Sequence, residues 1–169
     1  MENVNSISSS EQVARILSND WIVDGKLLSL AFTLRDRETY ISVNRPSIET
    51  YDADVTSFVE SHPKFKFDDR NYMRALLSVG EIRDIEIDAF GELLNFGVEV
   101  EPRDSRTKSH AGIFVRYGSQ NVKNGDTLTN NGKGISADDV LLKVRTRLMN
   151  LSVVEQKELI YSKDDNSDQ

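Results

Sequence analysis

Short apolar runs with period-2 alternation, closed by turn residues or prolines, constrain the fold of this chain more than any other feature. Leu28, Leu30 and Phe32 alternate in one run, and Ile41 and Val43 alternate in the next. Alternation of this kind is typical of strands with one buried face. Further runs of strand type cover 76–87, 96–100 and 113–117. Because few helical segments separate these runs, we expect a single α+β domain with a mostly antiparallel sheet rather than repeated βαβ units.

The clearest helical pattern lies near the C-terminal end, over 136–151. Ser136 and Asp139 have the spacing of a capping box. Apolar residues recur on one face of the pattern at Val140, Leu141, Val144, Leu148 and Leu151. Aspartates near its start and basic residues toward its end complement the helix dipole. The pattern predicts an amphipathic helix that packs across the sheet.

Weaker patterns predict two further helices and one strand pairing. Residues 8–19 carry apolar side chains at i, i+3 and i+4, and 52–61 carry a similar stripe. The connector 35–38 is wholly charged, so we expect it to lie in water. It joins the predicted strands 26–34 and 40–44, which therefore form a β-hairpin in this interpretation.

Glycines mark the irregular parts of the chain. Gly80 lies inside the run 76–87 and predicts a bulge or a break in that strand. Residues 118–135 contain four glycines and two Asn-Gly dipeptides. This composition predicts a long loop or a loose hairpin.

Length, charge and cysteine content restrict the class of protein. A chain of 169 residues can bury one core, and we expect one domain over 1–160 followed by a disordered acidic tail over 161–169. The absence of cysteine excludes disulfides and thiolate chemistry. A formal charge of −7 argues against general binding to nucleic acid. No apolar run approaches the ~20 residues that span a bilayer and the N-terminal residues do not resemble a signal peptide, so we expect a cytoplasmic protein without a membrane partner.

Residues 20–115 resemble a group of small bacterial proteins. The resemblance rests on Asp-Trp-Ile-Val at 20–23, Ser-Leu-Ala-Phe at 29–32, Ile-Ser-Val at 41–43, Gly-Glu-Ile-Arg at 80–83 and His-Ala-Gly-Ile at 110–113. It implies a bacterial source and one compact domain, and it implies no reaction.

His110 is the best single candidate for chemistry. Histidine is the side chain whose ordinary pKa lies nearest to neutral pH. Here it follows Lys108 and Ser109 at the start of a predicted strand. The functional interpretation makes it a general base or an anion ligand. The structural interpretation makes it a strand-start histidine that bonds a backbone carbonyl, and both stay open.

A locally basic region and one tryptophan are the candidate binding residues. Arginine and aromatic residues are favoured anchors in protein interfaces. The candidates are Trp21, Arg103, Arg106, Lys108 and Arg116.

Metal and nucleotide motifs are missing. Two histidines and no cysteine cannot supply an ordinary zinc site, so we predict no metal and no cofactor. The stretch Gly132-Lys133-Gly134 fails the phosphate-loop pattern, because Thr127 stands where its first glycine belongs. Arg45, Ser42 and Glu101 could be assigned the roles of an ADP-ribosyl-transfer-like site, but any chain of this composition would permit such an assignment.

Two classes of function follow. The first is a non-enzymatic accessory or immunity-type subunit that binds another protein. The alternative is a small enzyme, of the ADP-ribosyl-transfer or hydrolase type, with His110 at its centre. A pocket lined by Trp21, His110 and the 103–108 cluster favours the enzyme. A His110 enclosed by apolar side chains, with its nitrogens bonded to backbone, excludes it.

Overall fold

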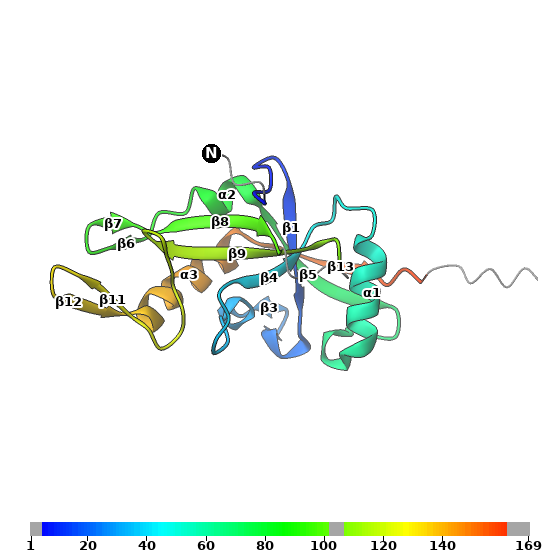
Figure 1. Cartoon of the computed structure of the whole chain (residues 1–169). Coiled ribbons are helices and arrows are strands. Elements are labelled where there is room, and N and C mark those ends of the chain that lie inside the picture. Colours follow the sequence, from blue (N-terminus) through cyan, green and yellow to red (C-terminus); the bar gives the residue numbers. More distant parts are fainter. Residues whose placement is uncertain (1–4, 102–106, 162–169) are drawn as a thin grey trace, which may run out of the picture.

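The computed structural model describes residues 5–101 and 107–161, and its main feature is an antiparallel sheet (Figure 1). The strand order is β10-β9-β4-β1-β5-β13, and β8 pairs with β9. The strands are β1 (Gln12–Leu17), β4 (Ile41–Asn44), β5 (Asn71–Ser78), β8 (Asn95–Val100), β9 (His110–Tyr117), β10 (Gln120–Asn121) and β13 (Val153–Glu158). The predicted α+β class and antiparallel sheet are confirmed. Of the tail predicted to be disordered, all but Tyr161 lies outside the described residues.

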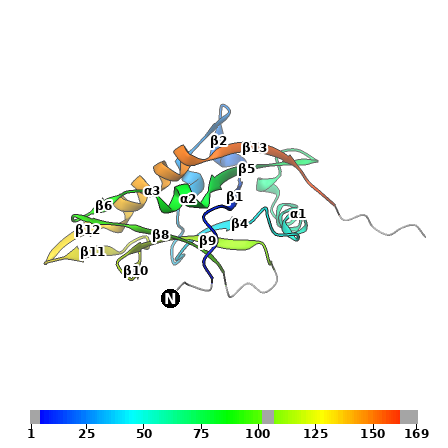
Figure 2. The same cartoon turned by 90° about the horizontal axis from the view of Figure 1, so that it is seen from above.

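The predicted helix near the C-terminal end is confirmed as α3 (Ala137–Leu151). Ser136 caps it by accepting a hydrogen bond from the amide of Asp138. Its buried side chains join the larger core, which also contains Val13, Val43 and Ile113 from three central strands. Figure 2 shows α3 and the short α2 along one side of the sheet. The apolar stripe of 136–151 therefore covers one sheet face.

A second, smaller core lies under α1 (Tyr51–Ser61). Val55 and Val59 of this helix pack with Ala14 and Ile16 of β1. The predicted helix 52–61 is confirmed, starting one residue earlier. Since Val13 and Leu17 face the larger core, β1 is buried on both of its faces.

This double burial explains why the predicted helix over 8–19 is wrong. A strand with two buried faces has a continuous apolar run rather than alternation. In such a run Val13, Ile16 and Leu17 match the i, i+3, i+4 template by coincidence. The run forms β1, which pairs with β5 along its whole length.

The predicted hairpin between 26–34 and 40–44 is also wrong. Within the first segment only β3 (Lys26–Leu27) is a strand, and it pairs with β2 (Ile22–Val23). Short 3-10 turns η1 (Asn19–Trp21) and η2 (Ser29–Phe32) flank this pair. In η2 the consecutive residues Ala31 and Phe32 are both buried, which a half-buried strand does not allow. β4 pairs instead with β9 and β1.

The run predicted as one strand over 76–87 is broken at its middle. β5 ends at Ser78, which caps α2 (Val79–Arg83) through its side chain. The amide of Gly80 donates to Ser9 O, and a Cβ at this position would lie 3.1 Å from that oxygen. The glycine thus permits a close backbone approach, and the break alternative is confirmed.

Several small elements complete the fold. η3 (Pro63–Phe65) follows α1, and β6 (Asp88–Ala89) pairs with β7 (Glu92–Leu93). The segment predicted as a loop or a hairpin contains a hairpin, β11 (Thr127–Asn130) with β12 (Lys133–Ser136). Its turn residues, Asn131 and Gly132, both have positive φ, as the tightest hairpins require. β13, by contrast, has no counterpart in the predicted elements.

Candidate functional site

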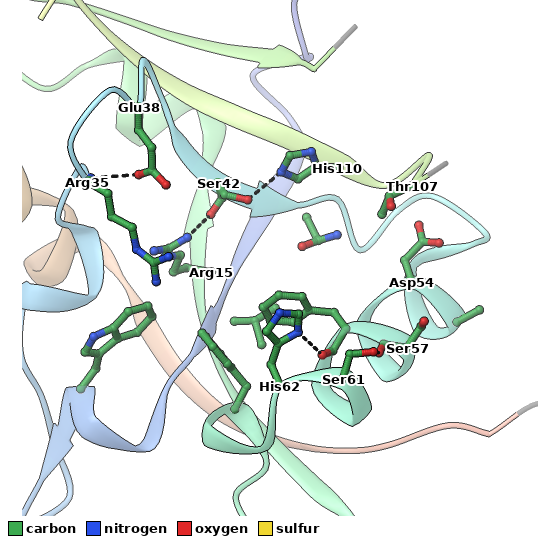
Figure 3. A pocket seen from close by; sticks show the side chains of 16 residues that line it. Arg15, Arg35, Glu38, Ser42, Asp54, Ser57, Ser61, His62, Thr107 and His110 are labelled. Carbon is green, nitrogen blue, oxygen red and sulfur yellow. Dashed lines mark hydrogen bonds between the residues drawn. The ribbon is translucent and has the colours of Figure 1, made fainter. Parts of the chain in front are cut away.

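A cavity of about 600 Å³ lies where β4 separates from β1. The two strands share a single register pair, Ala14 with Asn44, whereas β4 and β9 stay paired over four positions. The gap is bounded by α1, by the loop 35–38 and by the start of β9 (Figure 3). The opening between two strands of one sheet therefore brings side chains from both sheet halves to one place.

Arg15 bridges the gap between the separated strands. Its Nε donates to Ala31 O at 2.9 Å, and its Nη1 donates to Ser42 O on β4 at 2.8 Å. Burial lowers the pKa of Arg15 to about 10; the Glu38 carboxylate opposes this shift and the Arg35 guanidinium adds to it. Arg15 therefore stays charged at neutral pH, in a place that disfavours the charge.

One wall of the cavity is aromatic. The Arg15 guanidinium lies 5.0 Å from the Trp21 ring centroid, and Trp21 meets Phe65 edge to face at 5.6 Å. Phe58 stacks on His62 at 4.5 Å between centroids. His62 is held by a hydrogen bond between its Nδ1 and Phe58 O. The four rings of Trp21, Phe58, His62 and Phe65 contact one another in sequence and form an aromatic wall of the cavity.

Ser42 and His110 meet at the centre of the site. Ser42 Oγ and His110 Nε2 are 2.6 Å apart, and both residues line the cavity (Figure 3). They are cross-strand neighbours, because Ser42 of β4 pairs with Gly112 and Asn44 pairs with His110. In the tautomer with its proton on Nδ1, the imidazole accepts the serine proton through Nε2. This is the contact that a nucleophile and its general base make.

The start of β9 is fixed by a buried polar network. Ser109 is fully buried, and its amide and hydroxyl both donate to Asp54 Oδ2 of α1, at 3.1 and 2.7 Å. Asn44 donates to Ser109 Oγ, and the Arg45 amide donates to Ser109 O. Because His110 follows Ser109 directly, this network holds the histidine backbone against both α1 and β4.

A glycine on β9 makes room for the ring beside the histidine. Tyr40 meets His110 edge to face at 6.0 Å and Phe114 at 5.2 Å. A Cβ at Gly112 would lie 2.6 Å from Tyr40 Cδ2. The ring therefore rests on the glycine and limits the motion of the imidazole.

The structure separates the candidate residues into three groups. Trp21 and His110 both line the cavity, which meets part of the condition set for the enzyme hypothesis. Lys108 is exposed and does not line it, and Arg116 pairs with Glu99 at 2.6 Å on another part of the sheet. Arg103 and Arg106 lie outside the described residues.

The structure also adds residues that the sequence patterns did not identify as a site. Arg15 is the lone charge in the apolar run 13–17, and that interruption was the available signal. Arg35 and Glu38 belong to the connector expected to lie in water; they are exposed, and they also line the cavity. Ser42 gains its role only from its pairing across β4 and β9.

The residue set of the transfer-type hypothesis is not gathered at the cavity. Arg45 forms a bidentate pair with Glu11, with contacts of 3.0 Å, and neither Arg45 nor Glu101 lines the cavity. Burial works to raise the pKa of Glu11, but hydrogen bonds from Ser47 and Arg45 outweigh it and hold the pKa below its usual value. Arg45 is thus a structural cation.

Residues 5–101 and 107–161 lack two features that would indicate a metal or membrane protein. Within these ranges no three histidine, aspartate or glutamate residues come together as a metal site would need. Over the same ranges, no helix combines the length and the apolarity that crossing a bilayer demands.

Comparisons with protein-family models, with curated proteins and with solved structures returned no match.

Proposed function

We propose that the protein is a small hydrolase whose reacting pair is Ser42 and His110. The observation that carries the proposal is the 2.6 Å contact between Ser42 Oγ and His110 Nε2 inside a cavity of substrate size. A serine hydroxyl bonded to an imidazole is the arrangement that acyl-transfer enzymes use. The resemblance to small bacterial proteins and the lack of cysteine support a bacterial cytoplasmic setting.

The proposed reaction is the hydrolysis of an ester through a covalent intermediate. His110 Nε2 takes the Ser42 proton as Oγ attacks the ester carbonyl carbon. The ester C–O bond then breaks, and the leaving oxygen takes the proton from His110. A water molecule next gives a proton to Nε2 as its oxygen attacks the acyl carbon, and Ser42 leaves with that proton. The net change is ester plus water to acid plus alcohol.

The arrangement of neighbouring groups supports this assignment over a purely structural histidine. The side chain of His110 bonds a hydroxyl, whereas a structural strand-start histidine was expected to bond backbone carbonyls. Its surroundings are an open cavity with polar and aromatic walls. The backbone before it is fixed by Ser109, which reduces the cost of holding the pair in position.

A fluorophosphonate probe tests the proposal without knowledge of the substrate. The activated serine attacks phosphorus, fluoride leaves, and a stable covalent adduct forms. We expect the adduct on Ser42, and we expect Ser42→Ala and His110→Ala to reduce its rate by about 100-fold or more. Ser57→Ala and Ser61→Ala are matched controls, because both serines line the same cavity. Equal labelling of His110→Ala and the unmodified protein would refute the proposal.

A second candidate function, binding to another protein, is favoured by the exposed residues around β13. Among the described residues β13 pairs only with β5, so its outer edge offers unpaired backbone groups. Val153, Val154 and Ile160 are 60%, 38% and 53% exposed. This edge suits an extended partner segment that adds a strand.

Charged substitutions on the edge test the second candidate. A stoichiometric partner that uses β13 should be recovered with the unmodified protein and lost with Val154→Lys combined with Ile160→Lys. It should persist with Ser42→Ala, whose change lies in the cavity. Recovery that is equal for the edge variant and the unmodified protein excludes β13 as the docking edge.

A further inference from the structure

The geometry points to an organic anion with a planar ring as the ligand of this cavity, with its anionic group on Arg15 and Arg35 and its ring on the wall formed by Trp21, Phe58, His62 and Phe65. Calling this ligand the substrate rests on the proposed function. The inference about its chemistry rests on the charges and rings themselves.

Arg15 carries a charge that no salt bridge within the described residues pairs, although the Glu38 carboxylate attracts it electrostatically. Within the described residues its hydrogen bonds go to carbonyl oxygens, and no carboxylate there lies within salt-bridge distance of it. Nε and Nη1 are used, whereas Nη2 makes no hydrogen bond to a described residue. Removing a cation from water is costly unless an anion accompanies it. An anionic ligand in the cavity would supply that partner.

Arg35 adds a second cation at the same wall. It lies on the exposed loop 35–38, and it influences Arg15 electrostatically as a like charge. The Glu38 carboxylate partly offsets the repulsion between these two like charges, and a ligand anion between them would offset it further. Two guanidinium groups also suit the oxygen geometry of a carboxylate or phosphate.

The carboxylates that line the cavity are already engaged. Asp54 Oδ2 accepts three hydrogen bonds, from Thr50 Oγ1 and from the amide and hydroxyl of Ser109. Glu38 Oε2 accepts from the amide of Arg35 at 2.9 Å. These hydrogen bonds hold both acids in place, and within the described residues neither acid lies within salt-bridge distance of Arg15.

The anion subsite adjoins the reacting pair through one residue. Arg15 Nη1 donates to the carbonyl of Ser42, and the hydroxyl of Ser42 bonds His110. A ligand whose anionic group contacts Arg15 therefore lies next to the proposed nucleophile. The ring of such a ligand meets the face beyond Trp21, where Phe58 is 37% exposed. A volume of about 600 Å³ is within the range of small-molecule sites.

The only tryptophan of the chain provides the test, because Trp21 lines the cavity. We expect adenosine monophosphate, which joins a planar ring to a phosphate, to change Trp21 fluorescence in a saturable way. Adenosine lacks the anion and ribose 5-phosphate lacks the planar base, so each should bind about tenfold more weakly or worse. Nicotinate against nicotinamide makes the same comparison for a carboxylate, and the two pairs together distinguish phosphate from carboxylate as the preferred anion.

Two arginine variants make the test specific to the cavity. Arg15→Gln and Arg35→Gln should each abolish most of the preference for the anionic member of a pair. Arg147→Gln removes the same charge from an exposed position outside the cavity and should leave the preference unchanged. Arg35 is exposed, so its variant should keep a native circular dichroism spectrum even where Arg15→Gln does not. Equal affinity for the anionic and neutral members in the unmodified protein overturns the inference.

Failure of the proposed hydrolase function and failure of the proposed ligand class give different experimental results. If adenosine monophosphate binds with the expected preference while the fluorophosphonate fails to label Ser42, the ligand class is supported and the hydrolase is refuted. If Ser42 is labelled while no anion preference exists, the hydrolase is supported and the ligand class is refuted. His110→Ala should keep the anion preference, because the histidine is not part of the arginine subsite.

Discussion

Two arginines on neighbouring strands show opposite uses of the same side chain. Arg74 on β5 lies opposite Ile16 on β1, one residue from Arg15. Arg74 donates to Glu155 Oε2 through Nε and Nη2 and to Tyr51 through Nη1. Burial works to lower the pKa of Arg74, but the bonds to Tyr51 and Glu155 outweigh it and raise the pKa. Within the described residues Arg15 donates its hydrogen bonds to carbonyl oxygens, and burial lowers its pKa.

The difference separates a cation that completes the fold from one that is available to a ligand. Arg74 joins α1, β5 and β13, and the Tyr51 hydroxyl continues the network to Tyr72 at 3.0 Å. Burial raises the pKa of Tyr72, so that hydroxyl stays neutral. Nothing in this network needs an external partner. Arg15 in the cavity is charged without a paired carboxylate, and this is the basis for assigning an anion subsite there.

The largest stability effect should follow from removing the satisfied arginine. Arg74→Ala leaves Glu155 without its partner and removes a donor from Tyr51, and we expect a loss of about 2–3 kcal/mol in the free energy of unfolding. Urea unfolding followed by circular dichroism measures it. Arg147→Ala, at an exposed site, should stay within about 0.5 kcal/mol of the unmodified protein. If Arg74→Ala loses no more free energy of unfolding than this control, Arg74 is not the stabilising cation described above.

Removal of Arg15 should cost less stability, although its guanidinium is also buried. Arg15→Met gives up two hydrogen bonds to carbonyls and also removes a charge that lacks a counterion. These effects oppose each other, so we expect a loss of about 1 kcal/mol in the same urea experiment. A loss as large as that of Arg74→Ala would mean that Arg15 is a structural cation like Arg74.

The half-buried pair of Arg45 with Glu11 should show the pH dependence of a neutralised cation. The folded pKa of Glu11 lies below its usual value of 4.5, so its contribution is present above pH 4.5 and is lost as the pH falls through the folded pKa. Glu11→Gln should remove about 0.5–1 kcal/mol at pH 7 and nearly nothing near pH 2. Unfolding measured at both pH values checks this, and a deficit that is independent of pH would contradict it.

The parts of the fold that sequence predicts well are those with one buried face. Helix 136–151 has a cap and a single apolar stripe, so its local pattern contains the information that fixes it. β1 lies between two cores, and burial on both faces removed the alternation that identifies a strand. β13 carries Val153-Val154 followed by the continuous polar run Glu-Gln-Lys-Glu, and its pairing with β5 makes it a strand.

The candidate site was predictable only in part, for a related reason. Trp21 is the single tryptophan of the chain and His110 is one of two histidines, so both were candidates from the sequence. Both line the cavity. The meeting of Ser42 with His110 depends on the register of β4 with β9 over a long sequence separation. The role of Arg15 depends on the divergence of β1 from β4, which no local pattern records.

The most direct test of the central claim compares ligand-induced stabilisation in the two arginine variants. A ligand that binds only the folded state raises the thermal unfolding midpoint. We predict that saturating adenosine monophosphate raises the midpoint of the unmodified protein and of Arg74→Gln by similar amounts, and leaves Arg15→Gln nearly unchanged. An equal rise in Arg15→Gln, or its loss in Arg74→Gln alone, would contradict the assignment of the cavity charge to ligand binding.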